Sequence, residues 1–428
     1  MNMKRLMIVA FILGVLPFTL SAGGGQEAKA AGPATIVFQS IADPRETAAV
    51  TELIEKYKSV KPEITVEYRP FSGGLNDMEA KLLLNLSSGV GDPDIFVTQY
   101  SSGVTFAAAG WLEWIPAQFA STVESNLAHP GLKKPCVFEG QWYGLPHSLG
   151  TFILAYNKDH FQEAGLSDGP KDYDQLIDYA KKLTMYDAGG NMTRSGLYFR
   201  KSGHGHGNAT KWNQFYYAWG GKTPLFDEKS TYFNNQAAKD SLQYYLDAIY
   251  KHKVDSFNVE GDMNGLGKGT TSMIFRAPGA VILLETRYPD LNYGAFSVPK
   301  QVKSATMLSG VVSCVNKYSK NKAAVWDFLQ WFFQPEHCVE LAKSRGHAIL
   351  KQNLSDPFFE REMYVVENRQ NVEHPESVYS DPMMAGSYEG LMAIGRQVEN
   401  VCYKKVSIAE ALNAAEKDVQ EVIEKHHQ

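Results

Sequence analysis

TIVFQ at Thr35–Gln39, ITVEYR at Ile64–Arg69 and DIFVTQ at Asp94–Gln99 are three short runs rich in apolar and β-branched residues, which is typical of strands. The stretches between them, 44–60 and 76–88, carry apolar residues at helical spacing. This alternation of strands and helices predicts a parallel sheet covered by helices. We therefore expect an α/β fold.

The first predicted helix has a clear start signal. Asp43 stands where a capping residue accepts backbone N–H groups, Pro44 follows at the first helical position, and Glu46 is placed to reach back to the start. The same pattern, a capping residue with Glu or Gln three positions later, opens predicted helices at 172–184 and from Ser407 onward. These local signals predict where three helices begin.

A second series of strands and helices follows residue 151. A chain of 428 residues exceeds what one hydrophobic core usually supports, so we expect two lobes or domains. The predicted strands of this series are 152–157, 272–275, 294–299 and 310–316, and its other helices are 235–252 and 323–333.

The N-terminal segment has the composition of a secretory signal peptide. A basic start is followed by the apolar run 6–20 and by small residues that suit cleavage, which predicts a signal peptide at 1–23. Small and polar residues then predict a flexible tether at 24–33. The first cysteine is Cys136, so no lipid-attachment cysteine stands near the cleavage site, and no later stretch is apolar enough to span a bilayer. We expect a free periplasmic protein.

Charge and cysteine content narrow the class of protein. The formal net charge is -5 and basic residues are interspersed with acidic ones, so we expect no nucleic-acid partner. Four widely spaced cysteines include no C-x-x-C pair, which disfavours a zinc or thioredoxin-like site. The periplasm permits disulfides, so three pairings and free thiols all remain open.

Several short motifs resemble catalytic or metal sites without the context that such sites need. Residues 165–169 fit G-x-S-x-G, but Pro170 follows directly, where a nucleophile elbow requires a helix. His204 and His206 lack a third metal ligand at useful spacing. We expect no catalytic residue, no metal site and no cofactor.

Longer phrases occur in an order that points to one family. They include EGQWYGLP at 139–146, AYNKD at 155–159, GDPDIF at 91–96 and AGWL at 109–112. In this order the chain resembles the extracellular solute-binding proteins of sugar ABC importers, the maltose-binding-protein-like group. The likeness covers nearly all of residues 34–425.

The resemblance implies a two-lobed periplasmic binding protein fold in which each lobe is a β-sheet flanked by helices and uses discontinuous chain. It places an N-lobe at 34–148 and 300–335, a C-lobe at 149–299 and 336–428, and a hinge where the chain crosses. It also implies a monomer that captures a carbohydrate between the lobes and delivers it to ABC permease subunits in the inner membrane.

A sugar site needs aromatic faces and planar polar groups, and in α/β folds such groups gather where strands end. Several candidates therefore follow predicted strands, and others lie in an aromatic stretch or near the expected hinge. The predicted ligand-binding residues are Ser40, Phe71, Gln99, Tyr100, His147, Trp212, Trp219, Phe275, Arg276, Ser309, Gly310 and Arg345.

Two other functions remain open from the sequence. The first is a binding protein for another polar solute, such as a polyol, a sugar phosphate, an amine or an anion. Arg276 and Arg345 in one site would favour an anion. The second is a secreted glycosidase, which would need two carboxyl groups about 5 to 10 Å apart across a cleft.

Overall fold

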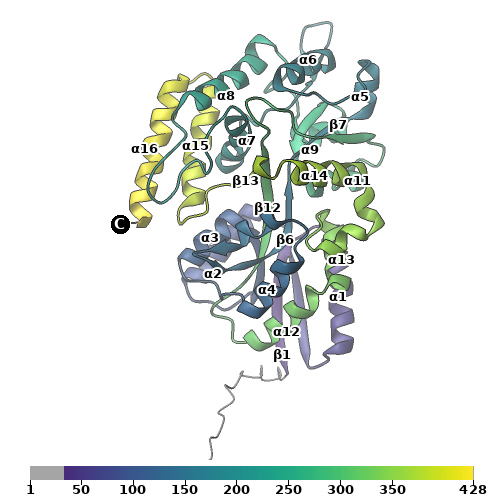
Figure 1. Cartoon of the computed structure of the whole chain (residues 1–428), viewed down its shortest axis with the longest axis vertical. Helices are drawn as coiled ribbons and strands as arrows, with labels where there is room; N and C mark the ends of the chain where they lie inside the picture. Colours follow the sequence, from purple (N-terminus) through teal and green to yellow (C-terminus); the bar gives the residue numbers. More distant parts are fainter. Residues whose placement is uncertain (1–32, 428) are drawn as a thin grey trace, which may run out of the picture.

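The computed structural model of the chain describes residues 33–427, so the predicted signal peptide at 1–23 and all but one residue of the predicted tether lie outside the described part. The described residues form two lobes along the long axis of the molecule, with strands β6 and β12 passing between them (Figure 1). Each lobe contains its own hydrophobic core.

The first lobe is built on a sheet with the order β13-β12-β3-β1-β2, and β6 also pairs with β12. The three strands predicted from the apolar runs are present, and β1 pairs in parallel with both β2 and β3. Strand β12 then runs antiparallel to β3 and to β6. The strands are β1 (Ala34–Ile41), β2 (Ile64–Phe71), β3 (Ile95–Gln99), β6 (Gly144–Thr151), β12 (Thr306–Val315) and β13 (Val378–Tyr379).

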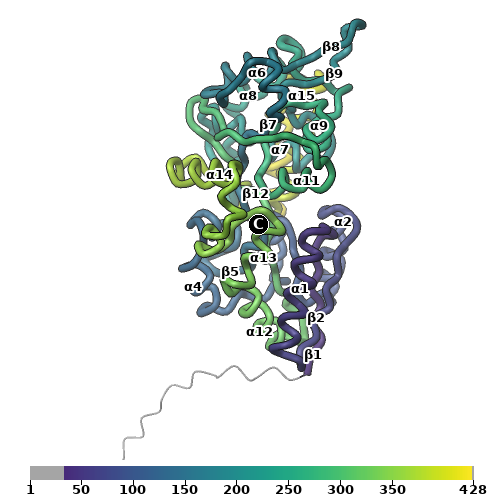
Figure 2. The backbone as a smooth tube through the Cα atoms, turned by 90° about the vertical axis from the view of Figure 1, so that its right-hand side faces the viewer, coloured from purple at the N-terminus to yellow at the C-terminus, as the bar shows by residue number. Residues whose placement is uncertain are grey.

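Helices cover this sheet, and α13 lies beside α1 in both views (Figures 1 and 2). The helices of this lobe are α1 (Pro44–Val60), α2 (Leu75–Ser87), α3 (Tyr100–Ala108), α4 (Ala117–Asn126), α12 (Lys322–Phe332) and α13 (Pro335–Arg345). A short hairpin joins β4 (Val137–Phe138) to β5 (Gln141–Trp142).

The second lobe has an antiparallel sheet with the order β10-β7-β11. The first four residues of the central strand are apolar because both of its faces are covered: Leu154 and Tyr156 pack into one core, and Ile153 and Ala155 into another. The strands are β7 (Ile153–Asn157), β10 (Met273–Arg276) and β11 (Tyr293–Phe296), and a separate hairpin joins β8 (Met185–Tyr186) to β9 (Met192–Arg194).

Most of the second lobe is helical. The pair α7 and α15 packs closely, and α16 lies against α15. The helices are α5 (Lys158–Glu163), α6 (Tyr173–Leu183), α7 (Gly205–Ala218), α8 (Gln236–Leu246), α9 (Asp262–Lys268), α10 (Pro278–Val281), α11 (Leu284–Arg287), α14 (Glu362–Glu373), α15 (Ser387–Cys402) and α16 (Ile408–His427).

The change of lobe after α12 comes later than the predicted boundary between residues 335 and 336. Cys338, Leu341 and Leu350 belong to the core of the first lobe, because α13 packs against α1. Helix α14 then packs against β11 of the second lobe. Residues 336–350 are therefore part of the first lobe, and the assignment of this segment to the C-lobe was wrong.

The start signals of the three helices were largely correct. Asp43 accepts the N–H groups of Arg45 and Glu46, as predicted. Ser407 and Glu410 cap each other through their side chains and backbone N–H groups. The prediction that Glu46 reaches back to the start of α1 was wrong, because its carboxylate turns into the interior instead.

All four cysteines of the chain lie in the described residues, and each is buried with a free thiol. Burial raises the pKa of all four thiols. Among residues 33–427, no helix combines the length and apolar character that a bilayer crossing requires.

Candidate functional site

A cavity of about 370 Å³ lies between the lobes and is lined from both of them. The first lobe contributes the start of α2 and the turn from β3 into α3, the second contributes α7 and the end of β10, and the crossing strands close the floor. The lining residues are Leu75, Asn76, Gln99, Tyr100, Ser101, Phe152, Arg200, His204, His206, Gly207, Thr210, Lys211, Arg276, Met307, Ser309, Gly310 and Asp381.

The turn from β3 into α3 is held by a buried carboxyl group. Glu79 of α2 accepts hydrogen bonds from the Thr98 hydroxyl at 2.7 Å, the Gln99 backbone N–H at 2.7 Å and the Ser102 hydroxyl at 3.0 Å. Burial raises the pKa of Glu79, while these donors lower it. The contacts fix the first turn of α3, which presents Tyr100 to the cleft.

Tyr100 connects the first lobe to the segment after β13. Its hydroxyl donates to the Leu308 carbonyl at 3.1 Å and accepts the backbone N–H of Asp381 at 3.1 Å. Burial raises the pKa of this phenol well above its ordinary value, so it stays neutral. Tyr100 thereby positions Asp381 at the wall of the cavity.

Asp381 is only 2% exposed, yet one of its carboxyl oxygens has no partner among the described residues. The other oxygen, Oδ2, accepts the Thr210 hydroxyl at 3.2 Å. Burial raises the pKa of Asp381 to about 7, although the hydrogen bond from Thr210 opposes this rise. The free oxygen can accept a hydrogen bond from a hydroxyl group of a solute. When the carboxyl group is protonated, it can donate a hydrogen bond to such a group.

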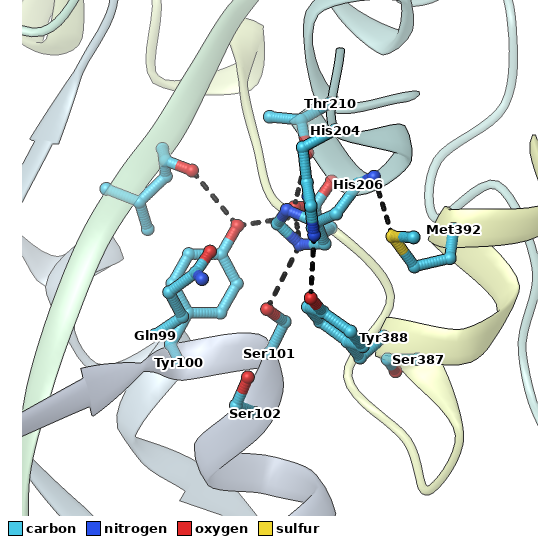
Figure 3. Close-up of polar contacts among 12 residues, drawn as sticks. Gln99, Tyr100, Ser101, Ser102, His204, His206, Thr210, Ser387, Tyr388 and Met392 are labelled. Atoms are coloured by element: carbon cyan, nitrogen blue, oxygen red, sulfur yellow. Dashed lines mark hydrogen bonds and ion pairs between the residues drawn. The ribbon is translucent and has the colours of Figure 1, made fainter. Parts of the chain in front are cut away.

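A polar contact joins the two lobes beside this carboxyl group (Figure 3). The hydroxyl of Ser101 on α3 lies 3.3 Å from Nε2 of His206 on α7, and that nitrogen lies 3.8 Å from Oδ2 of Asp381. Burial, together with the nearby His204 and Arg200, lowers the pKa of His206 to about 3, so the imidazole is neutral.

The other side of His206 is fixed by α15. The backbone N–H of His206 points at the sulfur of Met392 at 3.2 Å, and the hydroxyl of Tyr388 lies 3.1 Å from Nε2 of His204 (Figure 3). Helix α15 therefore sets the position of the α7 N-terminus that faces the cleft.

Three cations reach the cavity from the second lobe. Arg276 forms a two-pronged ion pair with Asp262, in which its Nε lies 2.7 Å from Oδ1. Lys211 donates to the Phe275 carbonyl at 2.5 Å, and its ammonium lies 3.5 Å from the centre of the Phe152 ring. Arg200 makes no hydrogen bond or ion pair with any described residue.

Five of the twelve predicted ligand-binding residues line this cavity. Gln99 and Tyr100 follow β3, Arg276 ends β10, and Ser309 and Gly310 lie in β12. Three of the five, Gln99, Tyr100 and Arg276, lie at a strand end or directly after one, which is the rule that selected them.

Three predicted residues lie instead in a buried network of the first lobe, which corrects their assignment to the ligand. Ser40 and His147 bond to Oε1 of Glu46 at 2.5 and 3.0 Å, and Arg345 lies 3.1 Å from Oε2. Arg345 therefore does not join Arg276 in one anion site. Burial raises the pKa of Glu46, but Arg345 and His147 overcome this and hold it at about 2.

The other four predicted aromatic residues do not line this cavity, because each ring packs elsewhere. Trp212 is fully buried and donates to the Ser241 hydroxyl at 3.0 Å. Trp219 packs among the rings of Tyr173, Phe215 and Tyr244. The ring of Phe275 belongs to the second core, and that of Phe71 lies 4.7 Å from the Lys81 ammonium.

The sequence analysis missed Arg200, His206, Thr210, Lys211 and Asp381. One signal was available: Lys211 is the only Lys, Arg, Asp or Glu between Lys201 and Lys222. An isolated charge in an aromatic helix marks a residue with a specific partner or ligand. Asp381 follows no predicted strand and carried no comparable signal.

Comparison with known proteins agrees with the two-lobed architecture. The family described as "Bacterial extracellular solute-binding protein" matches residues 42–337, which is more than half of the chain. The chain belongs to this family. As a solute-binding protein it is the receptor component of an ABC importer, and such receptors are not enzymes.

Individual relatives of this solute-binding protein are distant. The maltotriose-binding protein of Pyrococcus abyssi is 22% identical, over 86% of this chain and 77% of its own. The sn-glycerol-3-phosphate-binding periplasmic protein of Escherichia coli O1:K1 is 23% identical, over 64% and 66%. A solved solute-binding protein of Thermotoga lettingae, bound to α-D-tagatose, superposes with a TM-score of 0.77 at 22% identity, covering 91% of this chain and 99% of its own.

The cavity of the solute-binding protein also lacks the acid pair of a glycosidase. Asp381 is the only Asp or Glu among the residues that line it, whereas hydrolysis of a glycosidic bond uses two carboxyl groups facing each other. Among residues 33–427 no three His, Cys, Asp or Glu side chains gather in a way that could hold a metal ion.

Proposed function

We propose that this solute-binding protein captures a carbohydrate or a carbohydrate derivative in the cleft between its lobes and delivers it to a membrane permease. The observation that carries this proposal is that buried polar groups of both lobes meet in one cavity. Tyr100 and Gln99 come from the first lobe, Thr210 and Lys211 from the second, and Asp381 from the segment between them.

The size and lining of the cavity support a small hydroxylated solute. About 370 Å³ is at the lower end of the range for small-molecule sites, roughly 300–1,000 Å³. The unpartnered oxygen of Asp381 and the amides of Asn76 and Gln99 can exchange hydrogen bonds with hydroxyl groups. The ring of Tyr100 offers an aromatic edge at the cavity wall.

Capture follows from the two-lobed architecture. A solute held by groups of both lobes makes all its contacts only when the lobes are close, so binding shifts the population toward the closed form. The closed form then docks on permease subunits in the inner membrane. With a predicted signal peptide at 1–23, this proposal places the protein in the periplasm, as a monomer without a nucleic-acid partner.

A thermal-shift panel tests the proposal. The panel contains neutral mono-, di- and oligosaccharides, polyols, and their phosphorylated and carboxylated derivatives. We expect at least one compound to raise the melting temperature, because binding only the folded state stabilises it.

The variant Asp381→Ala should weaken binding of that compound at least tenfold, because the substitution removes the hydrogen-bond acceptor at the cavity wall. The matched control is Asp168→Ala, an exposed carboxylate of the second lobe, and it should bind like the native chain. A panel without any stabilising compound, or binding unchanged by Asp381→Ala, would contradict the proposal.

A further inference from the structure

The cleft contains more positive than negative charge. Arg200, Lys211 and Arg276 all line it, and of these three only Arg276 forms an ion pair with Asp262. The remaining carboxyl group of the cavity, Asp381, pairs with neither Arg200 nor Lys211, since its contacts are to Thr210, His206 and Tyr100. Two cations therefore face the cavity without a carboxylate partner among the described residues.

Lys211 is held in an unusual environment for an ammonium group. The residue is 7% exposed, lies on the inner face of α7, and is surrounded by the Phe152 ring and the Phe275 carbonyl. Burial of a cation without a counter-charge costs free energy. Burial holds the pKa of Lys211 well below its usual range, and Arg276 and Arg200 lower it further.

Arg200 is placed beside Lys211 by the local sequence. Its guanidinium packs against Gly207 so closely that a Cβ at that position would lie 2.4 Å from Cζ. Its Nε is buried and has no hydrogen-bond partner among the described residues. A guanidinium with free donors at a cavity wall is suited to binding a carboxylate or phosphate with two parallel bonds.

We infer that the solute carries a negatively charged group, a phosphate or a carboxylate, and that Arg200 and Lys211 bind it. This inference rests on the proposed function and deepens it, because it names the class of carbohydrate derivative. Arg200 and Lys211 receive the anion, and Asp381 with the turn at Gln99 receives hydroxyl groups. An anion supplies the counter-charge that Arg200 and Lys211 lack.

Matched ligand pairs test the inference by calorimetric titration of the whole secreted chain. The pairs are glucose with glucose 6-phosphate and gluconate, and glycerol with glycerol 3-phosphate and glycerate. Inorganic phosphate is the probe for the anion alone. We expect a charged member to bind at least tenfold more tightly than its neutral partner, and the phosphate and carboxylate members distinguish the two possible anions.

Single substitutions test which residues are responsible for the preference for a charged ligand. Arg200→Met and Lys211→Met should each weaken binding of the charged ligand at least tenfold, and should weaken it more than binding of the neutral partner. Gly207→Ala should act in the same direction by displacing Arg200, which provides a test if Lys211→Met does not fold. Lys182→Met is the control, because Lys182 is an exposed residue of α6 without a partner among the described residues. This variant changes the net charge equally and should bind ligands as the native chain does.

The outcomes separate the two proposals. Tight binding of a neutral sugar that does not improve with charge, or charged binding that survives both Arg200→Met and Lys211→Met, would overturn the inference and leave the proposed function standing. Failure of every neutral and charged compound to bind would overturn both.

Discussion

Glu46 lies in the first turn of α1, and groups from distant parts of the chain approach its carboxylate. Ser40 is six residues away, but His147 and Arg345 come from positions about 100 and 300 residues further on. A buried carboxylate is stable only with such partners. The network therefore ties β1, β6 and α13 together near the crossing between the lobes.

The network should give the protein a defined acid sensitivity. The pKa of Glu46 is about 2 in the folded state, below the ordinary value of 4.5. Its ionised form thus stabilises the fold fully above pH 4.5, and this contribution is lost as pH falls from 4.5 toward 2. We expect Glu46→Gln to lower the free energy of unfolding by about 1–3 kcal/mol at pH 7.

Urea unfolding at pH 7, 4 and 3 measures this prediction. The difference between the native chain and Glu46→Gln should shrink as the pH falls, because between pH 4.5 and 2 Glu46 is protonated in the unfolded chain but still ionised in the folded one, which favours unfolding of the native chain. Glu55→Gln, an exposed carboxylate on the same helix, is the control. A difference that stays constant from pH 7 to pH 3 would show that the charge of Glu46 is not responsible.

Individual residues also show what the sequence could and could not reveal about the site. Gln99 and Tyr100 were found because they follow a strand whose end can be read locally. Ser40 and His147 were assigned to the ligand for similar reasons, yet they bond to Glu46, which no local pattern indicates. Asp381 was missed because its place depends on a hydrogen bond from its backbone to Tyr100, 281 residues away.

Helices α7 and α15 approach each other through glycine. A Cβ at Gly395 would lie 1.7 Å from the carbonyl oxygen of Gly205, so no larger residue fits there while the helices keep their spacing. This contact and the bond between His206 and Met392 hold the start of α7 in place. Since α7 also carries Thr210 and Lys211, its position sets the geometry of the cleft.

We expect Gly395→Ala to push the two helices apart and to lower the free energy of unfolding by about 1–3 kcal/mol. Ligand affinity should fall severalfold as well, because the second-lobe contacts move together. Chemical unfolding and titration with the ligand from the panel measure the two effects. The neighbouring exposed variant Arg396→Ala should change stability by less than about 0.5 kcal/mol. Equal behaviour of the two variants would contradict this role of α15.

At the level of elements, the sequence predicted more than it did at the level of contacts. Strands β1, β2 and β3 and the caps of α1 and α16 depend on residues close together in the chain, and they were predicted. The segment 336–350 was assigned to the wrong lobe, because helical periodicity in α13 shows that one face is buried but not that α1 covers it. Trp212 was misassigned for the same reason.

For the molecule as a whole, the contact between Ser101 and His206 links a helix of one lobe to a helix of the other across the cleft. A hydrogen bond of this kind contributes on the order of 0.5–1 kcal/mol. It favours the close arrangement of the lobes even without a solute, and a bound solute adds to it. The unliganded protein should therefore be partly closed.

Small-angle scattering measures this property. We expect Ser101→Ala to increase the radius of gyration of the unliganded protein and to weaken ligand binding by about two- to fivefold, which corresponds to that range of energy. Saturating ligand should restore the native radius. Ser125→Ala on the outer surface of α4 is the control. An unchanged radius in Ser101→Ala would mean that the contact has no part in closure.

The four buried free thiols have a consequence for how the protein matures. With no cross-link among them, the chain reaches its final form without an oxidant or a disulfide isomerase. With their pKa values raised, the thiols are also poor nucleophiles at neutral pH, so oxidants find little to attack. A receptor built in this way matures equally well whether or not oxygen is present.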